Sequence, residues 1–371
     1  MPLTTIRTSN LDPNNGLLFR NRIINGDMRI DQRNAGASVT PANSYTLDRW
    51  QAVNTQASKF TVQQNAASVT PPAGFSNYLG VTSSSAYSVL TGDTFCVVQN
   101  IEGFNTYDLA WGTANAQTIT ISFWVRSSLT GTFGGALENN AANRSYPFSY
   151  TISSANTWEQ KSITIAGDTS GTWVGATNGI GIIVRFGLGS GSTYSGTAGA
   201  WAVGNFVQPT STVSVVGTNG ATFYITGVQL EVGTAATAFE RRPYGTELNL
   251  CQRYFHSMGG NQQYEHFAVV SQTQSTDSRG MIFLPVSMRT VPSIGQSGSF
   301  AVNGGVSSLT GTYSAGTTMY FNIGGNFGGV QNLGFDFWPG TAGSFNQTAA
   351  TMWVVRANAS TATRLTFSAE L

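Results

Sequence analysis

Few residues of this 371-residue chain have types and spacings that support metal or nucleotide chemistry. His256 and His266 are the only histidines and stand ten residues apart, which excludes HExxH sites and multi-histidine metal sites. Neither Lys59 nor Lys161 follows a glycine, so the phosphate-binding loop motif is absent. No GxSxG motif is present to support a serine–histidine–aspartate triad. We therefore expect no metal site and no cofactor.

A pair of carboxylates is the remaining route to catalysis, because glycoside hydrolysis needs only two of them at a suitable separation. That separation is a property of the folded chain, and the sequence does not exclude it. Asp108, Asp277 and Asp336 are candidates, but a turn or an arginine partner explains each of them more simply. We expect no catalytic residue, and cleavage of polysaccharide stays as an alternative.

Aromatic side chains in glycine-rich loops are the better functional signal. Sugars present C–H faces that stack on aromatic rings, and this contact needs no charge. The alternative for each ring is that it fills a core or a subunit interface. The candidate glycan-binding residues are Tyr107, Trp111, Tyr194 and Trp201 in the first half of the chain, and Tyr264, His266, Tyr313 and Trp338 in the second.

Composition narrows the class of protein further. Only 9% of the residues are charged and the formal net charge is +1, which disfavours nucleic-acid binding. Cys96 and Cys251 are too few for a disulfide framework, and we expect two buried free thiols. No run of eighteen apolar residues and no signal-peptide pattern occurs. We expect a protein made in the cytosol without membrane insertion.

Period-two alternation dominates the chain and predicts an all-β protein. Ile119–Arg126 alternates apolar and polar residues, as a half-buried strand does. In Thr222–Val232 the phase of the apolar residues switches at Gly227, which predicts a β-bulge there. Many short strands separated by turn residues favour sandwiches or jelly rolls. We find no solenoid period.

One helix interrupts the strands and marks a domain boundary. It is predicted to begin with Thr246 as its N-cap and to run to Phe255, with apolar residues on more than one face. We predict an arm at residues 1–20, a jelly-roll β-sandwich at 21–243, and at 244–371 the short helix plus a second, smaller C-terminal β-sandwich. The alternation at Leu365–Leu371 predicts a final strand packed into this second domain.

Two long motifs carry a resemblance to a known family. NRIINGDMRIDQRNAG (Asn21–Gly36), followed by YTLDRW (Tyr45–Trp50), resembles the opening of a phage virion and tail-fibre domain of carbohydrate-binding jelly-roll type. FYITGVQLEVGTAATAFERRPYGTELNLCQRYF (Phe223–Phe255) is similar to the end of that domain, where it joins a variable C-terminal domain. The matches, with weaker internal ones, cover about two-thirds of the chain.

Charged residues of these motifs predict contacts inside the domain. Arg29 and Arg33 are expected to pair with one of the nearby aspartates, and Glu231 is expected to meet the opening segment. The candidate aspartates are Asp27, Asp31 and Asp48.

Carbohydrate-binding jelly rolls frequently hold a structural calcium ion between an early acidic segment and a late aspartate. The corresponding positions of this chain read Met28-Arg29 and Thr226-Gly227, so the carboxylate ligands are replaced. We predict that no calcium binds there.

The resemblance implies a virion location, assembly in the host cytoplasm, and a homotrimer. Under this hypothesis the protein is a tail fibre or receptor-binding protein, whose arm binds other virion proteins and whose C-terminal domain contacts host-surface glycan. A head fibre or capsid decoration protein with an assembly or weak adhesion role is the alternative from the same family. The third hypothesis is that the protein is an enzyme that cleaves surface polysaccharide.

Overall fold

The computed structural model describes residues 19–262, 265–274, 277–298, 300–304, 313–314, 319–322, 332–339, 352–357 and 363–371. The chain forms two compact units, Met1–Glu247 together with Leu371, and Leu248–Glu370. The predicted arm lies outside the described residues except for Phe19 and Arg20. Each unit is described by itself below.

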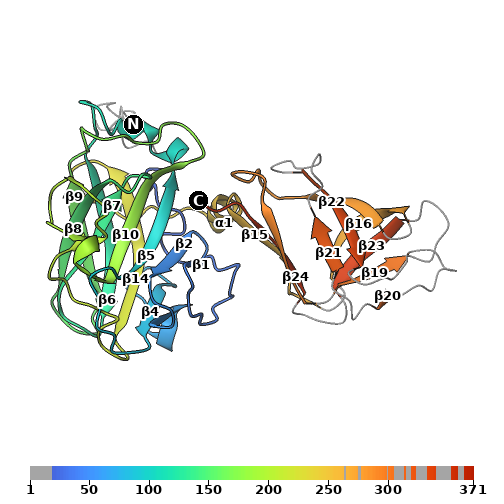
Figure 1. Cartoon of the computed structure of the whole chain (residues 1–371), viewed down its shortest axis with the longest axis horizontal. Coiled ribbons are helices and arrows are strands. Elements are labelled where there is room, and N and C mark those ends of the chain that lie inside the picture. Colours follow the sequence, from blue (N-terminus) through green and yellow to red (C-terminus); the bar gives the residue numbers. More distant parts are fainter. Residues whose placement is uncertain are drawn as a thin grey trace, which may run out of the picture. The chain divides into compact units, whose positions relative to one another are not determined.

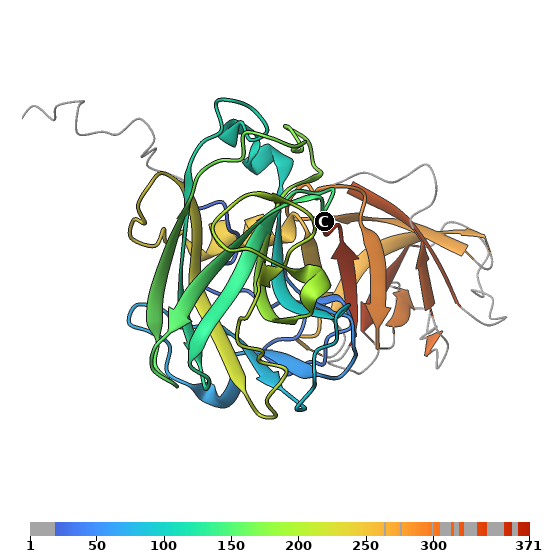
Figure 2. The ribbon, with the colours of Figure 1, turned by 60° about the vertical axis from the view of Figure 1, so that its left-hand side comes forward.

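The first unit is a sandwich of two antiparallel sheets (Figure 1). Figure 2 shows the same unit turned about the vertical axis, with the strands of its sheets side by side. The larger sheet has the order β1 (Ser44–Leu47), β2 (Trp50–Asn54), β5 (Thr94–Glu102), β10 (Ile180–Ser190), β7 (Gly131–Glu138), β8 (Arg144–Ile152) and β12 (Ala202–Val203). The smaller sheet has the order β3 (Phe60–Gln64), β4 (Leu79–Ser83), β14 (Thr222–Val232), β6 (Ile119–Ser127) and β9 (Glu159–Ile165). The short strands β11 (Ser195–Gly196) and β13 (Gln208–Pro209) pair in parallel beside them.

The core fills the space between the two sheets with apolar and aromatic side chains. Phe123 of β6 meets Tyr150 of β8 and Phe186 of β10, with ring centroids 5.0 Å apart in both pairs and near-perpendicular planes. Burial of each such ring contributes about 1.5–3 kcal/mol, so this contact between sheets is a main source of stability.

Strand β6 confirms the predicted alternation on its inner face and corrects it on the outer face. Ile121 and Phe123 are fully buried in the core, as expected. Thr120 and Ser122 are also buried, so the strand is not half-buried along its whole length. Thr120 Oγ1 donates to the carbonyl of Gly233, because the chain that leaves β14 continues beside the outer face of β6.

The bulge predicted at Gly227 is confirmed. Thr226 lies opposite Trp124 and Gln229 opposite Ser122, so β14 carries one residue more than β6 over this stretch. Gly227 has a φ of 60°, which a residue with a Cβ adopts only with strain. The extra residue returns Val228 and Leu230 to the core.

The opening motif is held against β14 by its own polar groups. The amide of Arg22 donates to the carbonyl of Leu230 (2.9 Å). Arg20 Nε lies 3.7 Å from Glu231 Oε2, so Glu231 contacts the residue that directly precedes the opening motif. The predicted arginine–aspartate pairs are also confirmed: Arg29 with Asp27 at 2.6 Å, and Arg33 with Asp48 at 4.0 Å.

The helix α1 spans Tyr244–Gln252, which corrects both predicted ends. Thr246 lies inside the first turn and is not the N-cap, because the amide of Glu247 already donates to the carbonyl of Pro243. A proline suits a helix start, where its missing N–H is not needed. Phe255 lies beyond the helix, as the first residue of β15 (Phe255–Gly259).

The second unit is also built from strands. In a three-stranded sheet, β24 (Arg364–Ser368) lies between β15 and β18 (Ser293–Ser297). Leu365 and Phe367 of β24 are fully buried, so the final strand packs into this unit as predicted. A second sheet has the order β20 (Tyr313–Ser314), β19 (Phe300–Gly304), β23 (Met352–Ala357), β16 (His266–Gln274), β17 (Asp277–Phe283), β22 (Asn332–Pro339) and β21 (Met319–Asn322).

These elements confirm the predicted fold class: an all-β chain with a jelly-roll sandwich, one short helix and a smaller C-terminal β-sandwich. Cys96 and Cys251 are both free and buried, as expected. Within the described ranges, no helix has the length and apolar character needed to cross a membrane.

Candidate functional site

Three tryptophans from distant parts of the sequence meet at one edge of the first unit. Trp111, Trp173 and Trp201 form a mutual cluster with ring centroids 4.8–5.4 Å apart and planes 73–82° apart. Tyr146 of β8 extends the cluster, with its ring 5.3 Å from that of Trp201. We refer to these four residues as the tryptophan cluster. Edge-to-face contacts of this kind contribute about 0.5–1.5 kcal/mol each beyond burial.

Hydrogen bonds fix the orientation of every indole in the tryptophan cluster. The Nε1–H of Trp111 donates to the carbonyl of Gln117 and that of Trp201 to the carbonyl of Ala166, both at 2.8 Å. Trp173 Nε1–H is shared between Asp168 Oδ2 (3.3 Å) and the carbonyl of Ser170 (3.2 Å). The N–H groups are therefore occupied, and of the three indoles only the half-buried ones of Trp173 and Trp201 keep part of their rings exposed.

A partly buried ion pair supports the loop that carries Trp173. Arg144 Nε donates to Asp168 Oδ2 at 2.9 Å, and Arg144 Nη2 lies 2.5 Å from Oδ1. The hydrogen bond to Asp168 raises the pKa of Arg144. Asp168 also accepts the amide of Ser170, so one carboxylate binds the loop, the arginine and the indole together.

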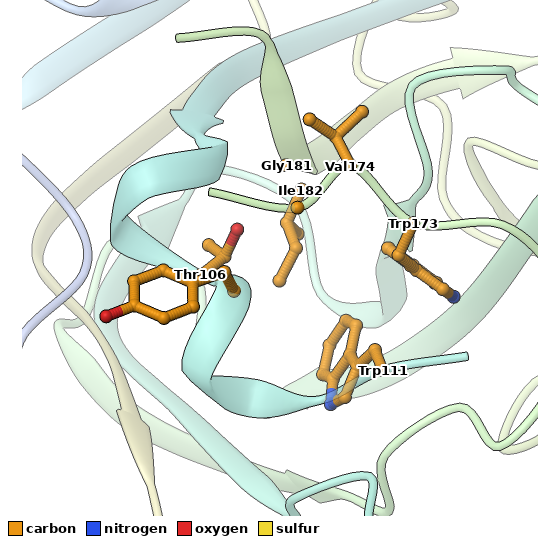
Figure 3. A pocket seen from close by; sticks show the side chains of 8 residues that line it. Thr106, Trp111, Trp173, Val174, Gly181 and Ile182 are labelled. Carbon is orange, nitrogen blue, oxygen red and sulfur yellow. The ribbon is translucent and has the colours of Figure 1, made fainter. Parts of the chain in front are cut away.

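A small cavity of about 60 Å³ opens beside the cluster (Figure 3). Figure 3 shows Thr106 on one side of it and the indoles of Trp111 and Trp173 on the other. Tyr107, in the 3-10 turn η4 (Tyr107–Leu109), is 57% exposed. None of the lining residues is charged: they are Thr106, Tyr107, Trp111, Trp173, Val174, Gly175, Gly181 and Ile182.

Three of the eight candidate aromatic residues lie together here, and they differ in how far their side chains are exposed. Tyr107 is exposed, Trp201 is half-buried, and Trp111 is 7% exposed and forms part of the cavity wall. Tyr194 lies elsewhere, in the 3-10 turn η5 (Ser192–Tyr194), packed against Cys96, Val98, Ile183 and Val207.

The candidate glycan-binding residues of the second unit do not form a site among the residues that the structure describes. His266 is exposed at the start of β16. Tyr313 and Trp338 lie in strands β20 and β22, of which only the backbone is described. Tyr264 lies outside the described residues.

Sequence reasoning did not select Trp173, Tyr146, Arg144 or Asp168 as site residues. Trp173 follows a Gly-Thr pair in a loop rich in glycine and threonine, the same signal that selected Trp111 and Trp201. Arg144 and Asp168 carried no local signal, because their pairing joins the start of β8 to the loop that follows β9.

The carboxylates considered for catalysis do not form a described pair. Asp108 is bound by Arg22, with Nη2 2.6 Å from Oδ2. Asp277 and Asp336 lie in β17 and β22, where only the backbone is described.

The positions that correspond to calcium ligands in the resembling domains have other roles. Arg29 pairs with Asp27 and donates to the carbonyl of Arg242, while Thr226 Oγ1 donates to the carbonyl of Asn77. Among the residues that the structure describes, no group of three or more His, Cys, Asp and Glu side chains is placed to hold a metal ion.

Comparison with known proteins yields structural similarity only. No protein-family model matches the chain, and no curated protein matches it significantly. The enzymatically active domain of tailspike protein 4 of bacteriophage CBA120 is similar over 58% of this chain and 22% of that chain, with 13% identity and a TM-score of 0.31.

Two sugar-related proteins are similar at the same level. A putative sugar-binding protein from Bacteroides thetaiotaomicron is matched over 57% of this chain and 100% of its own, with 12% identity and a TM-score of 0.34. The family 11 carbohydrate-binding module of a cellulosomal cellulase from Clostridium thermocellum is matched over 55% of this chain and 100% of its own, with 13% identity and a TM-score of 0.27. At such identities and TM-scores, these similarities carry no argument about function.

Proposed function

We propose that this protein is a structural component of a bacteriophage particle, assembled in the host cytoplasm, that contacts glycans of the host surface. The observation that carries the glycan contact is the tryptophan cluster with exposed Tyr107 beside it. The two long sequence motifs of the first unit support the virion role, since they resemble phage tail-fibre domains.

The chemistry of the site suits neutral sugars. The half-buried rings of Trp173 and Trp201 are held in fixed orientations by hydrogen bonds, so little side-chain freedom is lost when a sugar contacts them. The cavity of about 60 Å³ is far smaller than the roughly 300–1,000 Å³ of pockets that enclose small molecules. A glycan would therefore lie across this edge rather than inside it.

We propose a homotrimer, because an open site of this kind binds weakly and gains from multivalency. In a trimer, binding at one site holds the other two sites at a high effective concentration near the host surface. The overall avidity therefore rises without any new contact. An arm at residues 1–20 would attach the trimer to other virion proteins.

The contribution of Tyr107 is directly testable. Tyr107→Ala should weaken binding of host polysaccharide about fivefold, the equivalent of about 1 kcal/mol for one aromatic contact. Phe104→Ala is the matched control, because Phe104 is 50% exposed in the neighbouring 3-10 turn η3 (Gly103–Asn105) and does not line the cavity. Isothermal titration calorimetry measures both. Equal losses in the two variants, or no binding by the parent protein, would contradict the proposal.

A tail fibre and a head fibre differ in where they lie on the particle. We propose the tail fibre or receptor-binding role, for which antibody labelling in electron microscopy should mark the tail, and purified protein should block phage adsorption. Label on the capsid without blocking would favour the head-fibre alternative.

We also propose that the protein is not an enzyme. Incubation with host polysaccharide should release no reducing ends above a heat-treated control. Release of reducing ends would instead support the polysaccharide-cleaving alternative.

A further inference from the structure

The cavity beside the tryptophan cluster combines a small size with an uncharged lining. Its volume of about 60 Å³ is small for a ligand pocket and suits a substituent of a sugar rather than a whole sugar. Ile182 and Val174 supply apolar surface, and Thr106 supplies a hydroxyl. The nearest charged groups of the supporting loop, Arg144 and Asp168, are paired with each other.

The walls of this cavity are fixed by the backbone. The amides of Gly103 and Phe104 donate to the carbonyls of Gly179 (2.8 Å) and Thr177 (2.9 Å), which ties the 3-10 turns to the loop before β10. A Cβ at Gly181 would lie 2.0 Å from Thr106 Oγ1, so only glycine lets these two walls approach. The cavity is thus formed before any ligand arrives.

We propose that this cavity receives the acetamido group of an N-acetylated sugar, whose ring stacks at the exposed Tyr107. The proposal rests on the glycan contact proposed above and adds the chemical class of the sugar. The methyl group would contact Ile182 and Val174. The hydroxyl of Thr106, which donates to the carbonyl of Gly103 (3.4 Å), would accept the N–H of the acetamido group.

The same lining disfavours the other common substituents. A free ammonium or a carboxylate placed there would lose its hydration without gaining a counter-charge. A hydroxyl at the same position of the sugar carries no methyl group, so it would leave the apolar surface of Ile182 and Val174 in contact with water. The cavity therefore selects for acetamido by chemistry as well as by size.

Three trisaccharides that differ only at carbon 2 test this selection on the full chain. Chitotriose carries acetamido groups, its fully de-N-acetylated form carries ammonium groups, and cellotriose carries hydroxyls. We expect chitotriose to bind at least tenfold more tightly than either of the others, as measured by isothermal titration calorimetry at a mildly acidic pH, where the amino groups of the de-N-acetylated form are protonated. Equal or reversed affinities would overturn the proposal, and so would failure of all three to bind.

A bulky side chain at the mouth of the cavity locates the preference. Gly175 lines the cavity and is exposed, and a Cβ added to it would have no other atom within 4 Å, so Gly175→Leu adds a side chain at the mouth without a clash at its Cβ. Gly92→Leu is the matched control, because Gly92 is also exposed and has no atom within 4 Å of an added Cβ, but does not line the cavity. Gly175→Leu should reduce the preference for chitotriose over cellotriose to less than threefold, and Gly92→Leu should keep it.

The outcomes separate this proposal from the proposed function. If Gly175→Leu retained the full preference while folded, as judged by its near-ultraviolet circular dichroism, the acetamido group would bind elsewhere. Binding of host polysaccharide together with equal affinity for the three trisaccharides would leave the glycan contact intact and remove only the acetamido assignment. Loss of binding to host polysaccharide by the parent protein would remove both.

Discussion

At the scale of single residues, the first unit buries the carboxylate of Glu138 together with an arginine partner. Glu138 is fully buried on β7, and its Oε2 accepts Arg185 Nε at 2.7 Å and lies 2.6 Å from Nη2. Cys96 lies 3.8 Å from Arg185 Nη1, and burial raises the pKa of this thiol. The guanidinium therefore neutralises the carboxylate in a place that water does not reach.

Removal of this arginine should leave an uncompensated buried charge. Arg185→Met is expected to lower the free energy of unfolding by about 3–5 kcal/mol, because Glu138 then has no counter-charge. Urea titration followed by tryptophan fluorescence measures this, since six of the eight tryptophans, all except Trp338 and Trp353, belong to the first unit. The double variant Arg185→Met/Glu138→Gln should recover much of the loss. A double variant as unstable as the single one would argue for lost packing instead.

His256 provides a test of pH dependence in the second unit. Burial lowers the pKa of His256 from its usual 6.5, and its ring stacks on Phe367. Below pH 6.5 the unfolded chain binds a proton that the folded chain does not, so stability falls as the pH decreases from about 6.5 towards the folded pKa.

Calorimetric unfolding of the parent protein and of His256→Gln at pH 7.5 and 5.5 checks this prediction. The parent should lose more stability on acidification than the variant does. His266→Gln, which changes an exposed histidine of the same unit, should behave like the parent. An unchanged pH dependence in His256→Gln would show that other groups cause the effect.

At the scale of elements, one glycine decides which face of β14 enters the core. Without the extra residue at the bulge, either Phe223 and Ile225 or Val228 and Leu230 would point away from the core, because side chains alternate along a strand. All four are fully buried. The bulge therefore determines the burial of half of a central strand.

Substitution at this bulge should be costly. A Cβ at Gly227 would lie 2.6 Å from Phe75 Cζ, and the backbone φ of 60° adds strain. We expect Gly227→Val to lower the free energy of unfolding by about 1–3 kcal/mol, measured by urea titration. Gly175→Ala, at an open position, should change it by less than about 0.5 kcal/mol. Equal effects of the two substitutions would contradict a special role for the bulge.

At the scale of the whole molecule, the second unit leaves apolar side chains uncovered on one sheet. Val270 of β16 pairs with Gly280 of β17, so Val269 and Met281 are the next pair along, and Phe283 follows two residues later on the same face. Val269, Met281 and Phe283 are 50%, 52% and 68% exposed. Contiguous apolar residues on a soluble protein commonly mark an interface, which agrees with the proposed assembly of several copies.

Light scattering of the purified protein tests the proposed trimer. The expected mass is three times the 39.3 kDa of one chain, at concentrations down to the micromolar range. Phe283→Asp should lower the measured mass if this face is buried between copies. A stable monomer of the parent protein would refute the trimer.

The sequence by itself determined what depends on near neighbours in the chain. Alternation identified β6 and β24, and the phase switch located the bulge at Gly227, because a strand has a fixed period of two. The sequence located the helix, but both predicted ends were wrong. The helix begins directly after Pro243, whose carbonyl accepts the amide of Glu247, and not at Thr246. Residue types also limited the chemistry, as two histidines and two lysines support few motifs.

Only the tertiary structure decided which aromatics form a site. Trp111, Trp173 and Trp201 lie in three separate loops, and nothing in their spacing predicts that they touch. Their contact depends on strand order: β8 and β12 lie at one edge of the larger sheet, and the Arg144–Asp168 pair binds the loop before β10 to that edge. Such long-range pairing arises from the packing of whole sheets, and so the sequence supplied the candidate rings while the fold brought three of them, with Trp173, beside one cavity.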